Sequence, residues 1–306
     1  MRSRTISTAI AATVLTTFGA TAAFATTEPP DTTGAEGTAV GSTEPAGTIA
    51  DPATCAEGLT LEEGVLTVAT SEPAFPPYVI DDDPTSGEGF ESAVAYAVAE
   101  EMGFDAEHVE WVRAGFEESI APGPKDFDFN LQQYGITPER EQVVSFSLPY
   151  YTSTHALIAI GGTAAAEATD LASLRDLRIG VASGTTTLQF VEDVLQPTET
   201  AQVFDDNSAT IQALSTQQID AIVVDLPTAL FLTATEEQLA DAVVVGQFPP
   251  IDSAEGEPWG LMFEQDNPLA ECANYAILRL RESGELDEIT TTWMEESTEV
   301  PLIDLE

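Results

Sequence analysis

The chain has 306 residues, the size of one large domain or two ordinary ones, and 43% of them are apolar, enough to form a core. Nine lysines and arginines against 53 aspartates and glutamates give a formal net charge of −44, which argues strongly against nucleic-acid binding and favours a soluble monomer. Two cysteines and two histidines do not make a zinc site of the usual composition, and no metal or other cofactor is expected.

The first 25 residues have the pattern of a secretory signal peptide. Arg2 and Arg4 precede an apolar run over residues 6–24, and Ala23-Phe24-Ala25 offers small residues for cleavage after Ala25. A membrane anchor is the alternative, but the run is rich in threonine and alanine and therefore weakly apolar. No cysteine follows closely, so a lipid-anchored N-terminus is not expected. The pattern predicts an exported protein, periplasmic or extracellular.

Residues 26–55 form a second block, dominated by threonine, glutamate, proline, glycine and alanine. Such a composition does not bury enough apolar surface to offset its ordering entropy, so we expect a disordered acidic tether, with the fold beginning near Cys55. In an exported chain Cys55 and Cys272 are expected to form a disulfide. Two unrelated buried thiols are the alternative.

Short apolar runs alternate with helical patterns from Val65 onward. Predicted strands span residues 65–69, 109–112, 127–131, 156–160, 178–182, 221–224 and 243–245. Helices are predicted from Phe90 to Gly103, over 116–121, from Thr186, after a Ser208 cap, from Pro268 to Gly284, and around Ile289 and Trp293. This order predicts an α/β fold with mostly parallel sheets flanked by helices.

Six segments in register resemble one known family. They are residues 71–78 (SEPAFPPY), 89–91 (GFE), 135–140 (GITPER), 146–151 (FSLPYY), 183–186 (SGTT) and 219–225 (IDAIVVD). The stretch from Val65 to Met294 resembles the family 3 extracytoplasmic solute-binding proteins, the amino-acid-binding subunits of ABC importers.

The resemblance implies a periplasmic-binding-protein-like fold of type II with two lobes and a ligand cleft between them. Lobe 1 would comprise residues 56–152 and 250–306, and lobe 2 residues 153–249, with a two-segment hinge near 152–153 and 248–249. It implies a non-enzymatic receptor that captures a polar or charged L-amino acid and delivers it to the permease subunits. An enzyme on the same fold, of the cyclic-acid dehydratase type with Glu72 as the acid, and a ligand-sensing module of a signalling system are the alternatives.

An α-amino acid requires a cationic donor group at one end and an acid at the other. By resemblance Arg140 holds the ligand carboxylate, which its guanidinium can do with two parallel hydrogen bonds, and Asp225 takes the ammonium. From chemistry alone, Arg140 could equally form an ordinary salt bridge, and Asp225 could be a turn residue before Leu226-Pro227.

The remaining candidates surround these two. Thr185 and Thr186 lie where a strand turns into a helix and would add donors for the carboxylate, with simple helix capping as the alternative. Phe75 matches an aromatic wall, and Glu72 would share the ammonium. Gly135 replaces a hydroxyl residue that relatives often carry, which leaves its backbone N–H as a donor, and Gln133 is polar enough to line the cleft. Tyr78 is expected in the core or at a rim of the site. Arg113 is expected to be an ordinary residue at a strand end rather than a reader of the ligand side chain.

Overall fold

A computed structural model describes residues 50–235, 239–250, 256–294 and 300–305. The predicted signal peptide lies outside these residues, as does the predicted tether up to residue 49. The end of that tether is wrong, because residues 52–55 belong to helix α1 (Pro52–Ala56), whose Ala56 is buried in the core. No helix in the described part of the chain has the length and apolar character to cross a bilayer.

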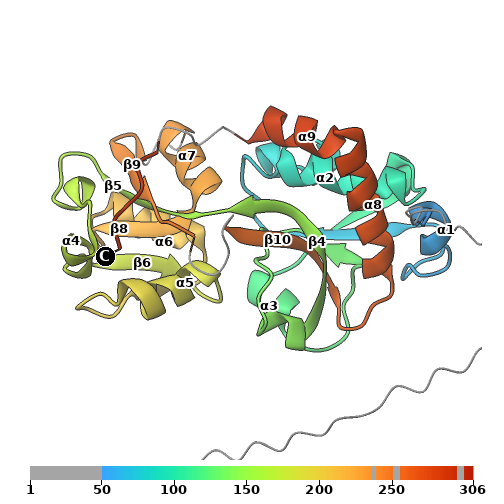
Figure 1. The fold of residues 1–306 in the computed structure, drawn as a ribbon, viewed down its shortest axis with the longest axis horizontal. Coiled ribbons are helices and arrows are strands. Elements are labelled where there is room, and N and C mark those ends of the chain that lie inside the picture. Colours follow the sequence, from blue (N-terminus) through green and yellow to red (C-terminus); the bar gives the residue numbers. More distant parts are fainter. Residues whose placement is uncertain (1–49, 236–238, 251–255, 295–299, 306) are drawn as a thin grey trace, which may run out of the picture. The chain divides into compact units, whose positions relative to one another are not determined.

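The first sheet has the strand order β2-β1-β3-β10-β4. Its strands are β1 (Leu66–Thr70), β2 (Val109–Arg113), β3 (Phe129–Asn130), β4 (Val144–Ser153) and β10 (Glu257–Glu264). Helices α2 (Phe90–Glu101), α8 (Leu269–Ser283) and α9 (Glu285–Trp293) pack on one another beside it (Figure 1), and α3 (Phe116–Ile120) follows β2. The predicted apolar stripe Phe90, Val94, Val98 and Met102 is buried in the core of this lobe.

The second sheet has the order β7-β6-β8-β5-β9. Its strands are β5 (His155–Ile160), β6 (Ile179–Ala182), β7 (Gln202–Phe204), β8 (Ala221–Asp225) and β9 (Ala242–Gln247). The helices of this part are α4 (Leu171–Arg175), α5 (Thr186–Phe190), α6 (Asn207–Ser215) and α7 (Leu226–Thr235). Two buried clusters, one around Leu157 and Val223 and one around Ile158 and Ile222, show that neighbouring residues of β5 and β8 face opposite sides of the sheet.

The predicted α/β fold is confirmed, but both sheets are mixed rather than mostly parallel. Within the described residues, each sheet has two parallel and two antiparallel strand pairings. The antiparallel pairings all involve β5 or β10. The chain enters the second sheet at β5 and returns to the first sheet at β10. Thr154 alone separates β4 from β5, and the return passes between β9 and β10, where residues 251–255 lie outside the described part. That these connections act as a hinge stays a prediction.

Residues 300–305 lie with the second sheet, although the sequence placed them in lobe 1. The Ile303 N–H donates to the Gln247 carbonyl at 2.9 Å, and Ile303 is buried in the cluster around Leu157. Leu171 N–H donates to the carbonyl of Asp304. Residues 300–305 are largely apolar but too short to give a periodic signal, so only the packing reveals this placement.

The predicted disulfide is confirmed. Cys55 and Cys272 are bonded, with their α carbons 5.5 Å apart and a sequence separation of 217. The bond ties α1, the first described helix, to α8 beside the first sheet.

Candidate functional site

A cavity of about 440 Å³ is lined by residues that follow strands of both sheets. Seven of the eight predicted ligand-binding residues line it: Glu72, Phe75, Gln133, Arg140, Thr185, Thr186 and Asp225. Gly135 is next to the cavity, because its carbonyl accepts from Arg140. Another hollow of about 460 Å³, between α2 and α9, contains none of the predicted residues. The structure therefore brings the predicted residues together at one place; their roles toward a ligand stay predictions.

Arg140 is held by backbone carbonyls from both sheets. The residue is 8% exposed, and its guanidinium donates to the Gly135 carbonyl at 2.7 Å and to the Gly184 carbonyl at 3.0 Å. It also lies 5.4 Å from the centroid of the Phe116 ring, a cation–π distance. Burial lowers the pKa of Arg140, and the nearby Glu257 partly opposes this. No acid lies within salt-bridge distance of Arg140 among the described residues, so the ordinary salt bridge considered from the sequence does not form there.

Asp225 ends β8 with both carboxylate oxygens hydrogen-bonded. The Tyr78 hydroxyl donates to Oδ1 at 2.5 Å, and Thr228 donates from its N–H to Oδ1 and from its hydroxyl to Oδ2. Burial raises the pKa of Asp225, and these hydrogen bonds oppose the rise. The bond from the Thr228 N–H makes Asp225 the N-cap of helix α7 rather than a turn residue, and the same carboxylate also lines the cavity. Tyr78, expected in the core or at a rim, is buried but reaches the site through its hydroxyl.

Thr185 and Thr186 use their hydroxyl groups differently: Thr185 caps a helix, and Thr186 faces the cavity. Thr185 caps α5: its hydroxyl accepts from the Leu188 N–H and donates to the Ala182 carbonyl. The Thr186 hydroxyl instead points to the acid Glu257 and donates to its Oε2 at 3.0 Å. The Thr185 hydroxyl is therefore used for capping, whereas the Thr186 hydroxyl reaches Glu257 of the first sheet across the cavity.

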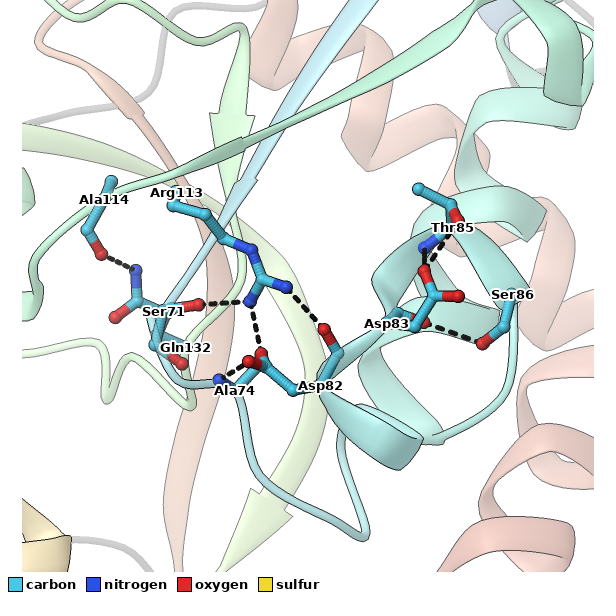
Figure 2. A network of polar contacts seen from close by, with 9 residues as sticks. All are labelled: Ser71, Ala74, Asp82, Asp83, Thr85, Ser86, Arg113, Ala114 and Gln132. Carbon is cyan, nitrogen blue, oxygen red and sulfur yellow. Dashed lines mark hydrogen bonds and ion pairs between the residues drawn. The ribbon is translucent and has the colours of Figure 1, made fainter.

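Hydrogen bonds from Arg113 hold the loop that carries Glu72 and Phe75. As Figure 2 shows, Arg113 donates to the Ser71 carbonyl at 2.6 Å and to both the carboxylate and the carbonyl of Asp82. The same Asp82 carboxylate accepts from the Ala74 N–H. Arg113 therefore positions the loop and does not line the cavity, in agreement with the structural interpretation of this arginine.

Gln133 joins the cavity to a buried acid. Its backbone N–H and its side-chain amide both donate to Glu91, which also accepts from the Tyr150 hydroxyl. Glu91 is 1% exposed, and burial raises its pKa to about 7, with the three hydrogen bonds working against the rise. Gln133 has positive φ of 50°, a backbone conformation that turns its amide toward Glu91. Its side chain thus supports the site as much as it lines it.

Among the titratable cavity residues that sequence reasoning missed, Glu257 and His155 lie next to each other. Glu257 opens β10, and its Oε2 lies 3.6 Å from His155 Nε2. Burial lowers the pKa of His155 to about 4 and raises that of Glu257 to about 7. No motif marks either residue; the only signal in the sequence was the missing side chain at Gly135, the space that Glu257 fills.

Residues 66–296 match the model of the bacterial extracellular solute-binding proteins, family 3. The chain is 26% identical over 228 residues to the arginine-binding periplasmic protein of Mannheimia haemolytica, covering 74% of this chain and 90% of that one. Among solved structures, an ancestral arginine-binding protein bound to arginine is 28% identical with a TM-score of 0.64, covering 76% of this chain and 99% of that one. The ancestral amino acid-binding protein AncCDT-1, a precursor of cyclohexadienyl dehydratase, is 26% identical with a TM-score of 0.62, covering 76% and 96%. The type II fold that the motifs implied is confirmed, and the chain belongs to the family 3 bacterial extracellular solute-binding proteins.

Proposed function

We propose that this protein captures a cationic L-amino acid and delivers it to the permease of an ABC importer. The charge of the cavity carries the proposal. Seven acids line it, whereas Arg140 is the only lysine or arginine among its described lining residues: the acids are Glu72, Glu117, Glu118, Asp205, Asp206, Asp225 and Glu257. Arg140 supplies the cation for one α-carboxylate, and Asp225 with Glu72 supplies the acids for the α-ammonium. The four acids Glu117, Glu118, Asp205 and Asp206 then favour a second positive charge on the ligand.

The relatives agree with this charge pattern. Two of the proteins compared above carry arginine in their names, and the ancestral protein was solved with arginine bound. The proposal narrows the prediction from the sequence, which left polar and charged amino acids open. We also propose that the chain acts outside the cytoplasm as a monomer, exported by its first 25 residues.

Calorimetric titration with arginine, lysine, glutamine and glutamate tests the ligand class. We expect arginine or lysine to bind more tightly than glutamine, and glutamate to bind weakly, because its side-chain carboxylate would meet the acids of the cavity. Tighter binding of glutamate than of arginine would refute the charge argument, and no binding of any amino acid by the folded protein would refute the function.

Arg140→Ala tests the carboxylate position. Loss of a charge-assisted donor pair should weaken binding about 100-fold or more. Arg175→Ala is the matched control, because Arg175 is exposed, donates to the Leu195 carbonyl and does not line the cavity. Equal affinity of the Arg140→Ala and Arg175→Ala proteins would show that the motif does not hold the ligand.

We propose a binding protein rather than an enzyme, although an ancestor of a dehydratase shares the fold. Glu72, the acid that the sequence offered for catalysis, is exposed on its loop, where water solvates its carboxylate. Incubation with a cyclohexadienyl acid, followed by product chromatography, checks this choice; turnover would overturn it.

A further inference from the structure

Glu257 places a carboxyl group at the Arg140 end of the cavity. Its side chain is 17% exposed, and its Oε2 accepts from the Thr186 hydroxyl at 3.0 Å. Its Oε1 is buried, and the described residues give that atom no hydrogen-bond partner. A buried acceptor without a partner is costly, so this atom points to a group that arrives with the ligand.

Gly135 shows how closely the carboxyl group approaches this end. A Cβ atom built on Gly135 would lie 1.6 Å from Glu257 Oε1, so no residue with a side chain fits at position 135 while Glu257 keeps its place. Arg140 donates to the carbonyl of the same glycine at 2.7 Å. The position of the Glu257 carboxyl group therefore depends on glycine at position 135.

The charged and titratable groups around Glu257 come from three other elements. Arg140, at the end of the segment 135–140, lowers the pKa of Glu257, and Asp225 at the end of β8 raises it. His155 on β5 lies 3.6 Å from it and is neutral near pH 7, because burial lowers its pKa to about 4. Tyr134 lies beside Arg140, and burial raises its pKa, so it stays protonated. Arg140 is thus the one cation facing Glu257 at neutral pH among the described residues.

We propose that Glu257 takes up a proton from solvent when the α-carboxylate of the ligand binds beside Arg140, and so makes the affinity depend on pH. The inference rests on the proposed function. Two carboxylates beside one buried guanidinium repel each other, and protonation of one removes the repulsion. A proton on Oε1 turns the unpartnered acceptor into a donor to the ligand carboxylate, so the same step satisfies the buried atom.

The consequence is a coupling of known sign. Bound ligand raises the affinity of Glu257 for its proton, so by linkage the proton raises the affinity for the ligand. At pH 5.5 Glu257 is already protonated and the coupling is silent. Above pH 7 the dissociation constant should increase by up to about tenfold per pH unit, the limit for one proton. The ligand ammonium beside Asp225 lowers the pKa of that carboxyl and so favours proton release. Proton uptake by Glu257 and proton release by Asp225 therefore have opposite signs.

The experiment is calorimetric titration with arginine at pH 5.5, 7.0 and 8.0, each in two buffers of different ionisation enthalpy. We expect almost no proton uptake at pH 5.5 and uptake approaching one proton per ligand at pH 8.0. Glu257→Gln should bind without proton uptake and with the same dissociation constant at all three pH values, because its amide donates in one charge state. Glu264→Gln changes the other end of β10, outside the cavity, and should keep the profile of the unmodified protein.

The outcomes separate the two proposals. Proton uptake that persists in Glu257→Gln, or an affinity of the unmodified protein that is constant from pH 5.5 to 8.0, overturns the role of Glu257 and leaves the proposed function standing. If neither the unmodified protein nor Glu257→Gln binds any amino acid at any of these pH values, the proposed function fails, and the inference fails with it.

Discussion

The buried acid Glu91 should make the native chain less stable as the pH rises. Burial raises its pKa from the usual 4.5 to about 7. Its stabilising contribution is complete below pH 4.5, where it is protonated in both states, and is lost as the pH rises through 7. One pKa unit corresponds to about 1.4 kcal/mol, so the ionised group lowers the free energy of unfolding by about 3 kcal/mol at pH 8.5.

Glu91→Gln removes the ionisation and keeps most contacts. Glu91 Oε1 accepts from both Tyr150 and the Gln133 N–H, and a glutamine oxygen can do the same. The new amide nitrogen faces the Gln133 side chain, which gives a cost that does not depend on pH. The free energy of unfolding of the variant minus that of the unmodified protein should therefore increase by about 2.5 kcal/mol between pH 5 and 8.5.

Urea denaturation followed by tryptophan fluorescence at pH 5.0, 6.5 and 8.5 measures this difference. Glu100→Gln, exposed on the same helix, is the control and should leave the difference constant. Tyr150→Phe removes a donor that lowers the pKa of Glu91, so the loss of stability should start at the same pH but extend to a higher pH. A difference between Glu91→Gln and the unmodified protein that stays constant with pH would refute the assignment of a neutral Glu91 at acidic pH.

Two further predictions concern the disulfide and Tyr78. Cleaving the Cys55–Cys272 bond opens a loop whose ends have a sequence separation of 217. In the chain-entropy model this should lower the free energy of unfolding by up to about 5 kcal/mol, measured as urea curves with and without reductant. An unchanged curve would refute the contribution. Tyr78→Phe removes the donor to Asp225 Oδ1 and should weaken amino-acid binding by about fivefold to tenfold in calorimetry. Tyr96→Phe, whose hydroxyl bonds Thr85 and Trp111 away from the cavity, is the control; equal affinities would contradict the role of Tyr78.

Local patterns predicted the parts of the fold that depend on near neighbours in the sequence. The run before Asp225 is a buried strand, and the stripe that begins at Phe90 is a buried helix face. The cap of α6 was misplaced: Asp206 accepts from the Ala209 N–H, so Asp206 and not Ser208 caps this helix. Both residues satisfy the same capping rule, and the sequence alone does not choose between them.

Among the elements that escaped prediction, β4 and α7 have identifiable physical reasons. Strand β4 (Val144–Ser153) buries roughly every third residue, because its pairing with β10 shifts register twice around Gly260, and this erases the alternation typical of a strand. Helix α7 begins at Leu226-Pro227, a dipeptide interpreted as a turn, although proline is well suited to the first turn of a helix.

Cavity-lining residues were predicted where they stand in a sequence motif and missed where their position depends on a contact with a residue distant in the sequence. Arg140, Asp225 and Thr186 stand in motifs, and all three line the cavity. Glu257 became visible only through its contact with Gly135, which no local pattern encodes. The same holds for Tyr78, whose burial the sequence suggested but whose bond to Asp225 it did not.

The groups proposed to bind the ligand are also the groups that join the two sheets. Tyr78 from the first sheet's side bonds Asp225 of the second, Arg140 bonds the Gly184 carbonyl, and Thr186 bonds Glu257. A ligand that uses Asp225 and Arg140 therefore enters an existing set of hydrogen bonds between the sheets, and the free energy of rearranging that set becomes part of its affinity. Substitutions at these positions change both quantities at once. Counting the protons taken up on binding separates them, because a change in the arrangement of the sheets alone has no reason to follow the charge of Glu257.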